Sequence, residues 1–124
     1  MNIAARLARP ELLSLAPYRA AHWDPGFIRL HANENPWRAV GDTTVDGLAR
    51  YPQPMPEAVR TQLANLYEVP TTHVLPTRGA DEGIDLLARG FLTAGRDAAL
   101  VCPPTFGMYA VATHIQGADV VEVP

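Results

Sequence analysis

Apolar residues recur at helical spacing in two segments of the second half of the chain. The first set consists of Val59, Leu63, Leu66 and Tyr67. The second set consists of Ile84, Leu87, Ala88 and Phe91. Residues three, four and seven positions apart share one face of an α-helix, so the spacing predicts one helix beginning at Pro56 and another following residues 77–82. Pro56 suits a first helical position, where its missing N–H is not needed. A third helix is expected over residues 107–115.

Short apolar runs predict three strands, over residues 73–76, 98–102 and 120–123. The run 98–102 contains no charged side chain, which is typical of a strand covered on both faces and would place Cys102 in the core. The alternation of helices and strands predicts an α/β fold with crossover helices. Three strands would leave one edge and part of one face of a sheet without partners. We therefore expect an incomplete sheet, with its remaining strands outside this sequence.

The first fifty residues lack such a pattern and are expected to be irregular. A strand-like run, 27–30, leads into the polar run 31–36, which ends at a proline. These segments contain too few apolar residues to form a core alone. We expect an arm or connection that packs on another part of the protein. Residues 51–56 contain three prolines and are expected to be stiff and extended.

The composition narrows the class of protein. The chain has 124 residues, of which 48% are hydrophobic, as expected of one globular domain. Ten arginines and thirteen acidic residues give a net charge of −3, which argues against binding to nucleic acid or to an anionic membrane. Prolines and glycines interrupt the longest uncharged run, 98–118, so no membrane-spanning helix is predicted. The single cysteine fits a reducing compartment, and we expect a soluble, cytoplasmic protein.

Two absences limit the chemistry available to the chain. All ten basic residues are arginine, so no lysine side chain offers an amine as nucleophile or covalent anchor. The histidines are not spaced in the close pairs that metal ligands usually form, and no metal site is expected. They are His22, His31, His73 and His114.

The segment from Thr77 to Glu82 is a candidate anion site. It is expected to join a strand to a helix, and the small residues Gly79 and Ala80 let the backbone approach a ligand closely. Free amides and the positive end of the helix dipole at such a turn favour a phosphate. The same segment is also compatible with a plain turn in which Asp81 is the N-cap and satisfies these amides itself.

Aromatic residues supply a second group of candidates. Phe106 follows the strand 98–102, at the edge of a parallel sheet where ligands of open α/β folds bind, and its ring can stack on a planar ligand. Alternatively, Phe106 and Tyr109 are core residues of the next helix. Tyr51, before the prolines, is either a loop anchor or a phosphate donor, and composition does not separate the two.

Together, four segments resemble the histidinol-phosphate aminotransferases. Their order and rough spacing follow that family across nearly the whole chain: Leu30–Pro36, Arg50–Pro54, Thr77–Ile84 and Cys102–Tyr109. The resemblance implies an enzyme of histidine biosynthesis that depends on pyridoxal 5'-phosphate, has the aspartate-aminotransferase fold and forms a homodimer. It implies that residues 1–50 are an N-terminal arm and small-domain or dimer-contact segment. Residues 51–124 would then begin the large cofactor-binding α/β domain.

The resemblance also assigns roles to individual residues. The backbone amides of Ala80 and Asp81 would hold the cofactor phosphate, and Phe106 would stack on the pyridine ring, where the family often has tyrosine. Tyr51 would reach the cofactor phosphate of the neighbouring subunit. Two residues of the arm, Tyr18 and Asn33, would contact the substrate, which is imidazole-acetol phosphate or histidinol phosphate, with glutamate as the other substrate.

The chain departs from the family in what it lacks. The family's later aspartate, lysine and substrate-binding arginine sites are not present, so we expect an N-terminal portion that is catalytically inactive alone. Two other interpretations remain open. One is a related enzyme of the same fold type, such as a phosphothreonine decarboxylase or another aminotransferase. The other is a non-catalytic binding or assembly module.

Overall fold

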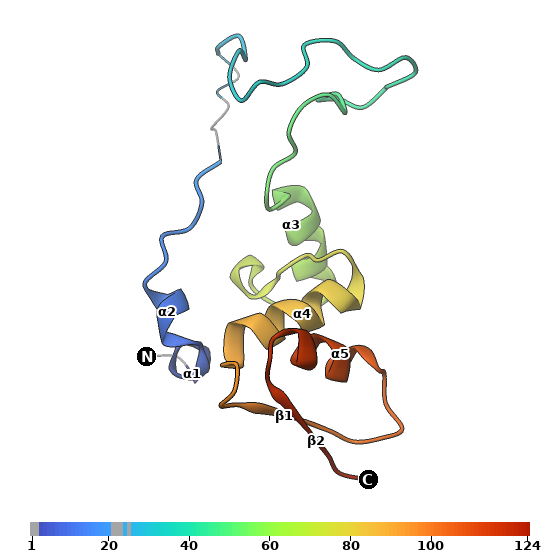
Figure 1. The fold of residues 1–124 in the computed structure, drawn as a ribbon. Coiled ribbons are helices and arrows are strands. Elements are labelled where there is room, and N and C mark those ends of the chain that lie inside the picture. Colours follow the sequence, from blue (N-terminus) through green and yellow to red (C-terminus); the bar gives the residue numbers. More distant parts are fainter. Residues whose placement is uncertain (1–2, 21–23, 25) are drawn as a thin grey trace. The chain divides into compact units, whose positions relative to one another are not determined.

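The computed structural model describes residues 3–20, 24 and 26–124 (Figure 1). The contacts within the chain define two compact units. The first unit contains residues 1–16 and 77–124, and the second contains residues 17–76. The predicted domain boundary after residue 50 stays a prediction.

The first unit is built on a small parallel sheet. Strand β1 (Ala98–Val101) pairs in parallel with β2 (Asp119–Glu122), with Ala98 opposite Asp119 and Val101 opposite Glu122. Helix α5 (Met108–Ile115) joins the two strands and contacts both of them. Helix α4 (Gly79–Phe91) precedes β1 and packs against α5. This order confirms the predicted α/β pattern with a crossover helix.

The helices cover one face of this sheet. Figure 1 shows α4 and α5 on the same side of β1 and β2. Exposure alternates along β1: Val101 is buried, whereas Leu100 keeps 65% of its surface exposed. The expectation of a strand covered on both faces is therefore wrong for the described chain. Cys102, expected in the core, is exposed, because it follows the last residue of β1 in the loop toward α5.

The core of the first unit consists of small side chains. Its buried residues lie on α4, β1, α5 and the turn before β2, and they are Ala88, Val101, Ala112, Thr113 and Ala118. Small residues at these positions let α5 lie close to the strands and to α4. The buried hydroxyl of Thr113 donates a hydrogen bond to the carbonyl of Tyr109 within α5, at 2.7 Å.

Two turns at one end of the sheet are tied together. The amide of Gly95 donates to the carbonyl of Gly117 at 2.8 Å, and the amide of Asp119 donates to the carbonyl of Asp97 at 3.2 Å. The Asp97 carboxylate accepts from the Arg96 side chain and from the amide of Thr93, and these bonds lower the pKa of Asp97 to about 2. The turn between α4 and β1 is thus held by one carboxylate.

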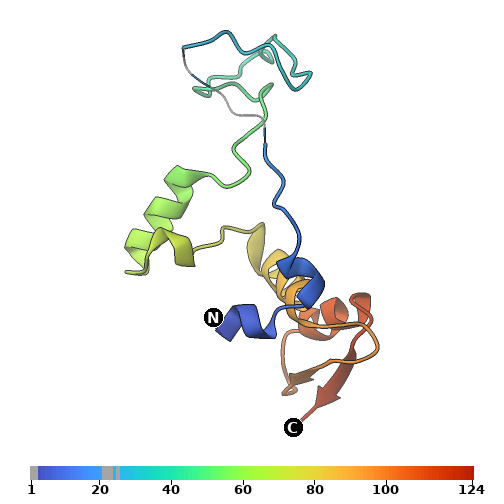
Figure 2. The ribbon, with the colours of Figure 1, turned by 90° about the vertical axis from the view of Figure 1, so that its left-hand side faces the viewer.

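Two short helices, α1 (Ile3–Leu7) and α2 (Pro10–Leu13), also belong to the first unit. They lie beside α4 in both views (Figures 1 and 2). The amide of Arg9 donates to the carbonyl of Gly90 at 3.0 Å, and its guanidinium donates to the carbonyl of Arg89 at 3.1 Å. The expectation that the first fifty residues are wholly irregular is therefore wrong at these two helices.

The second unit contains one helix of three turns. Helix α3 (Glu57–Leu66) begins one residue later than predicted, with Pro56 as its N-cap residue, and it buries Ala64. A short 3-10 helix, η1 (Thr71–His73), follows, and Arg60 of α3 donates to the carbonyl of Thr71 at 2.8 Å. Residues 26–56 form loops.

The predicted strand 73–76 and the strand-like run 27–30 are not strands in the described residues. Residues 27–30 and 73–76 form no ladder, although the backbone of Val74 is extended (φ −113°, ψ 124°). A strand requires a neighbouring strand to accept and donate its backbone hydrogen bonds, and neither run has one here.

Two features are absent from the described residues. No helix in this part of the chain is long and apolar enough to cross a membrane. No three histidine, cysteine, aspartate or glutamate side chains in the same part are grouped so that they could bind a metal ion.

Candidate functional site

The start of α4 is open to solvent. Gly79, Ala80 and Asp81 are exposed, and Gly79 adopts a left-handed backbone conformation (φ +81°) with no other atom within 4 Å of the position a Cβ would take. The N-cap residue is Arg78, and its side chain makes no capping hydrogen bond. Because an α-helix does not use its first amides, those of Ala80 and Asp81 remain available to a ligand.

The alternative in which Asp81 is the N-cap is therefore wrong. Asp81 is the third residue of α4, and the turn before the helix is held by other groups. The hydroxyl of Thr77 donates to the carbonyl of Gly79 at 2.8 Å. The carboxylate of Glu82 accepts from the amide of Arg78 and from its guanidinium, the latter at 3.0 Å.

The charges beside this helix start are partly paired. The hydrogen bond from the Arg78 amide, followed by that from its guanidinium, holds the pKa of Glu82 below its ordinary value. The same side-chain hydrogen bond raises the pKa of Arg78. Glu82 is therefore ionised and neutralised by Arg78, which reduces its repulsion of an anion at the first turn of α4.

The second candidate, Phe106, lies in the loop between β1 and α5. Its side chain is 53% exposed, and its ring packs edge-on against Tyr109, with the ring centroids 6.2 Å apart and the planes at 88°. Tyr109 is itself 43% exposed. Neither ring is a core residue, and the edge-on contact leaves a face of the Phe106 ring free for a planar group.

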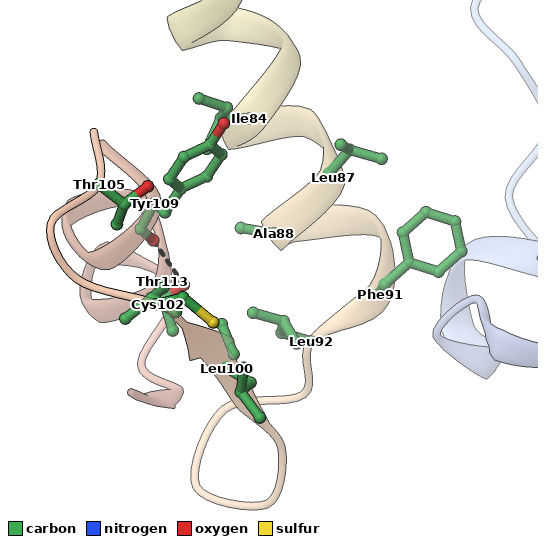
Figure 3. Close-up of a pocket in the computed structure, with 12 residues that line it drawn as sticks. Ile84, Leu87, Ala88, Phe91, Leu92, Leu100, Cys102, Thr105, Tyr109 and Thr113 are labelled. Atoms are coloured by element: carbon green, nitrogen blue, oxygen red, sulfur yellow. Dashed lines mark hydrogen bonds between the residues drawn. The ribbon is translucent and has the colours of Figure 1, made fainter. Parts of the chain in front are cut away.

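An apolar cavity of about 360 Å³ lies between α4, β1 and α5 (Figure 3). In Figure 3 the side chains of Ile84 and Tyr109 lie toward one end of this cavity, and those of Leu92 and Leu100 toward the other. The further lining residues are Leu87, Ala88, Phe91, Ala99, Val101, Cys102, Thr105 and Thr113. Helix α4 from Ile84 onward and the loop after β1 therefore border one cavity.

This arrangement brings two sequence-predicted groups to the same end of the first unit. Ala80 lies one helical turn before Ile84, and Phe106 directly follows Thr105, with both Ile84 and Thr105 lining the cavity. In Figure 3 the side chain of Thr105, in the loop after β1, lies toward the same end of the cavity as those of Ile84 and Tyr109. The open start of α4 and the exposed ring of Phe106 thus each adjoin a residue that lines this cavity, an arrangement that is compatible with a planar ligand carrying a phosphate.

The remaining candidates belong to the second unit. Tyr18 is 90% exposed and Tyr51 is 67% exposed, so both phenol groups can contact a ligand or another chain. Asn33 is exposed and, like Ala32 before it, has a left-handed backbone (φ 51° and 65°). Left-handed conformations of residues other than glycine are uncommon, and two in succession fix an unusual course of the chain.

The loop that carries Asn33 and Tyr51 is anchored by a group that the sequence pattern does not indicate. The carboxylate of Glu34, whose side chain is 1% exposed, accepts hydrogen bonds from the amide of Tyr51 at 2.7 Å and from the guanidinium of Arg50 at 3.2 Å. It also forms an ion pair with Arg29. The sequence signal for this cluster is weak, because its members are up to 22 residues apart and no local spacing rule connects them.

Opposing effects set the ionisation of Glu34. Its burial is the largest single influence and raises the pKa, but the hydrogen bond from the Tyr51 amide and the charges of Arg29 and Arg50 together outweigh it. The pKa of Glu34 therefore lies below its ordinary value, and the buried carboxylate is ionised.

Comparisons with known proteins identify the family. Residues 27–124 match the family described as aminotransferase class I and II. The histidinol-phosphate aminotransferase of Stenotrophomonas maltophilia is 46% identical over 120 residues, which are 95% of this chain and 33% of that protein. Those of Xanthomonas euvesicatoria and Colwellia psychrerythraea are 44% and 36% identical, and the aligned regions cover 95% and 96% of this chain and 33% and 35% of those proteins.

The chain spans about a third of the length of these curated relatives. Aminotransferases of this family generally depend on pyridoxal phosphate. The small parallel sheet with its crossover helix is consistent with part of the aminotransferase fold. The match over residues 27–124, most of the sequence, shows that the chain belongs to the aminotransferase class I and II family.

Proposed function

We propose that this chain is part of a histidinol-phosphate aminotransferase. The whole enzyme would transfer an amino group between glutamate and imidazole-acetol phosphate in histidine biosynthesis, with pyridoxal phosphate as cofactor. The observation that carries this proposal is the open first turn of α4 together with the exposed ring of Phe106, each adjoining a residue that lines the same cavity. It occurs in a chain that is 36–46% identical to histidinol-phosphate aminotransferases.

The residues present fit the cofactor. The amides of Ala80 and Asp81 would bind its phosphate, since they are unused by the helix and lie at the positive end of the α4 dipole. Open space around Gly79 leaves room for the phosphate oxygens. The exposed ring of Phe106 would stack on the pyridine ring and hold its plane. When bound, the cofactor supplies an electron sink for bonds at the substrate's amine-bearing carbon.

The other candidate residues would act from the second unit. Tyr51 would donate from its hydroxyl to the cofactor phosphate of a neighbouring subunit, which makes the working enzyme a homodimer. Tyr18 and Asn33 would contact the substrate. We place this enzyme in the cytoplasm, where histidine biosynthesis uses soluble enzymes.

The 124 residues would bind and orient, and they would not carry out the chemistry. Because the chain contains no lysine, it offers no side-chain amine to attach the cofactor or to move a proton at the substrate. Those steps belong to groups elsewhere in the whole enzyme. We therefore propose that the isolated chain is catalytically inactive.

Substituting proline for Ala80 tests the phosphate-binding role. Ala80 is the second residue of α4, where proline fits because the helix does not use that amide. Ala80→Pro removes one donor to the phosphate, and a hydrogen bond to a charged group corresponds to a loss of about tenfold or more in affinity. The measurement is an absorbance titration of the whole apoenzyme with pyridoxal phosphate, together with its transamination rate.

Helix α3 offers a matched control. Ala58 is likewise the second residue of its helix, and no predicted site residue lies on α3. We expect Ala58→Pro to leave cofactor affinity within about twofold of the unsubstituted enzyme. Equal affinities for Ala80→Pro and the unsubstituted enzyme would exclude the assigned phosphate site. Failure of the unsubstituted enzyme to transaminate imidazole-acetol phosphate would exclude the proposed activity.

A further inference from the structure

The loop that carries Asn33 and Tyr51 is anchored at a single buried carboxylate. Both oxygens of Glu34 are used: Oε1 accepts from the Tyr51 amide at 2.7 Å and pairs with Arg29, and Oε2 accepts from Arg50 at 3.2 Å. The side chain of Glu34 is 1% exposed, whereas those of Arg29 and Arg50 are 18% and 27% exposed. The guanidinium of Arg29 also reaches the carbonyl of Tyr51, at 3.5 Å.

These contacts fix the backbone around Tyr51 from both sides. Glu34 holds the Tyr51 amide and the side chain of the preceding Arg50, and Pro52 restricts the following backbone dihedral. The phenol group of Tyr51, in contrast to its backbone, is not held by these contacts. It is 67% exposed, and its hydroxyl has no hydrogen-bond partner within the described chain. A fixed backbone with an unused, exposed polar group is the arrangement expected of a residue that binds something outside its own unit.

We infer that Glu34 is a positioning residue that holds Tyr51 where its hydroxyl reaches the cofactor phosphate. This inference rests on the proposed function, because the phosphate contact of Tyr51 belongs to that proposal. Glu34 itself touches no ligand in this account. It acts through the Tyr51 amide, and its ionised state strengthens that hydrogen bond.

Stabilisation of the loop alone is the competing explanation, and the ion pairs of Glu34 with Arg29 and Arg50 would be sufficient for it. The two explanations differ in one respect. A residue that only stabilises the loop lowers cofactor affinity independently of the Tyr51 hydroxyl, whereas a positioning residue loses its effect once that hydroxyl is gone. A double-mutant cycle between Glu34 and Tyr51 measures this difference.

The cycle uses Glu34→Ala, Tyr51→Phe and the double variant in the whole enzyme, with pyridoxal phosphate as the titrant of the apoenzyme. Each single variant is expected to lower cofactor affinity about tenfold, the usual effect of one lost hydrogen bond to a charged group. The double variant is also expected to lose about tenfold, far less than the about hundredfold expected of independent effects. Additive losses would overturn the inference.

Two further variants remain informative if Glu34→Ala folds poorly. Glu34→Gln keeps an oxygen that can accept from the Tyr51 amide and removes only the charge, so its affinity should lie between those of the unsubstituted enzyme and Glu34→Ala. Asp42→Ala is the matched control, because Asp42 anchors the same stretch of chain through the amides of Thr44 and Leu48, at 3.0 and 2.7 Å. It should leave cofactor affinity within about twofold.

Amide hydrogen exchange gives a readout that does not involve the cofactor. We expect Glu34→Gln and Glu34→Ala to speed exchange at the Tyr51 amide, and Asp42→Ala to leave it unchanged. Unchanged exchange in both Glu34 variants would overturn the inference while leaving the proposed function intact. An unsubstituted enzyme that binds no pyridoxal phosphate would instead refute the proposed function, and this inference with it.

Discussion

The turn between α5 and β2 contains a glycine, Gly117, whose replacement by any other residue type is expected to destabilise the first unit. Gly117 has a left-handed backbone (φ +77°), and a Cβ built there would lie 3.2 Å from the Cβ of Ala94 in the neighbouring turn. The left-handed conformation costs a non-glycine residue about 1–2 kcal/mol. A contact of 3.2 Å requires the turns to separate, which costs about 1 kcal/mol more. We expect Gly117→Ala to destabilise the first unit by about 2–3 kcal/mol.

A substitution at Gly95 separates the backbone contribution from the steric contribution. It also has a positive φ (+68°), but no atom lies within 4 Å of the position of its added Cβ. Gly95→Ala is therefore expected to destabilise the unit by only about 1–2 kcal/mol, the backbone contribution alone. Combining Gly117→Ala with Ala94→Gly should recover about 1 kcal/mol, because the Cβ contact is removed.

Native-state hydrogen exchange measures these differences. The amides of Asp119 and Val123 donate to the carbonyls of Asp97 and Val101, so their exchange reports opening of the sheet and its turns. A destabilisation of 2 kcal/mol corresponds to about 30-fold faster exchange. Equal acceleration by Gly95→Ala and Gly117→Ala, or no recovery on adding Ala94→Gly, would refute the assignment of a steric contribution at Ala94.

Three further outcomes follow from groups described above. The pKa of Asp97 is lowered from 3.8 to about 2, so its carboxylate stabilises the fold above pH 4 and this contribution is lost as the pH falls toward 2. Denaturation between pH 5 and pH 2.5 should show a steeper loss of stability for the native chain than for Asp97→Asn, and parallel curves would contradict it. Phe106→Ala should weaken pyridoxal phosphate binding by the whole enzyme about tenfold, whereas Phe106→Tyr keeps the ring and should change it less than twofold; an equal loss in both variants would exclude stacking. Borohydride reduction of the isolated chain with pyridoxal phosphate should leave no adduct on any side chain, since lysine is absent, and peptide mapping by mass spectrometry would reveal an adduct if one formed.

The helices of the second half could be predicted because their signals are local. The apolar spacing predicted both helices, and Ala88 is buried on α4, but Ala64, the buried residue of α3, lies outside the predicted spacing. The predicted positions Val59, Leu66 and Tyr67 are 45%, 71% and 67% exposed. Strands β1 and β2 could also be predicted, since each is the other's parallel partner within the same unit. The run 73–76 has the same apolar character but no partner in the described chain, and strand formation depends on the partner as much as on the run itself.

The remaining errors and omissions concern properties that sequence spacing does not contain. An apolar run does not show how many faces of a strand are covered, and for this reason Cys102 was expected in the core although it is exposed. The open start of α4 could be predicted from its small residues, but the choice between Arg78 and Asp81 as N-cap required the backbone geometry. The cluster around Glu34 joins residues distant in sequence, which no periodicity indicates.

The hydrogen bonds from Arg9 to the carbonyls of Arg89 and Gly90 have a consequence for the order of folding during synthesis. About 80 residues separate these partners, and ribosomes add roughly 5–20 residues each second, so α2 has no α4 to dock on for the first several seconds of its existence. The α2 segment therefore leaves the ribosome early yet completes its native contacts late.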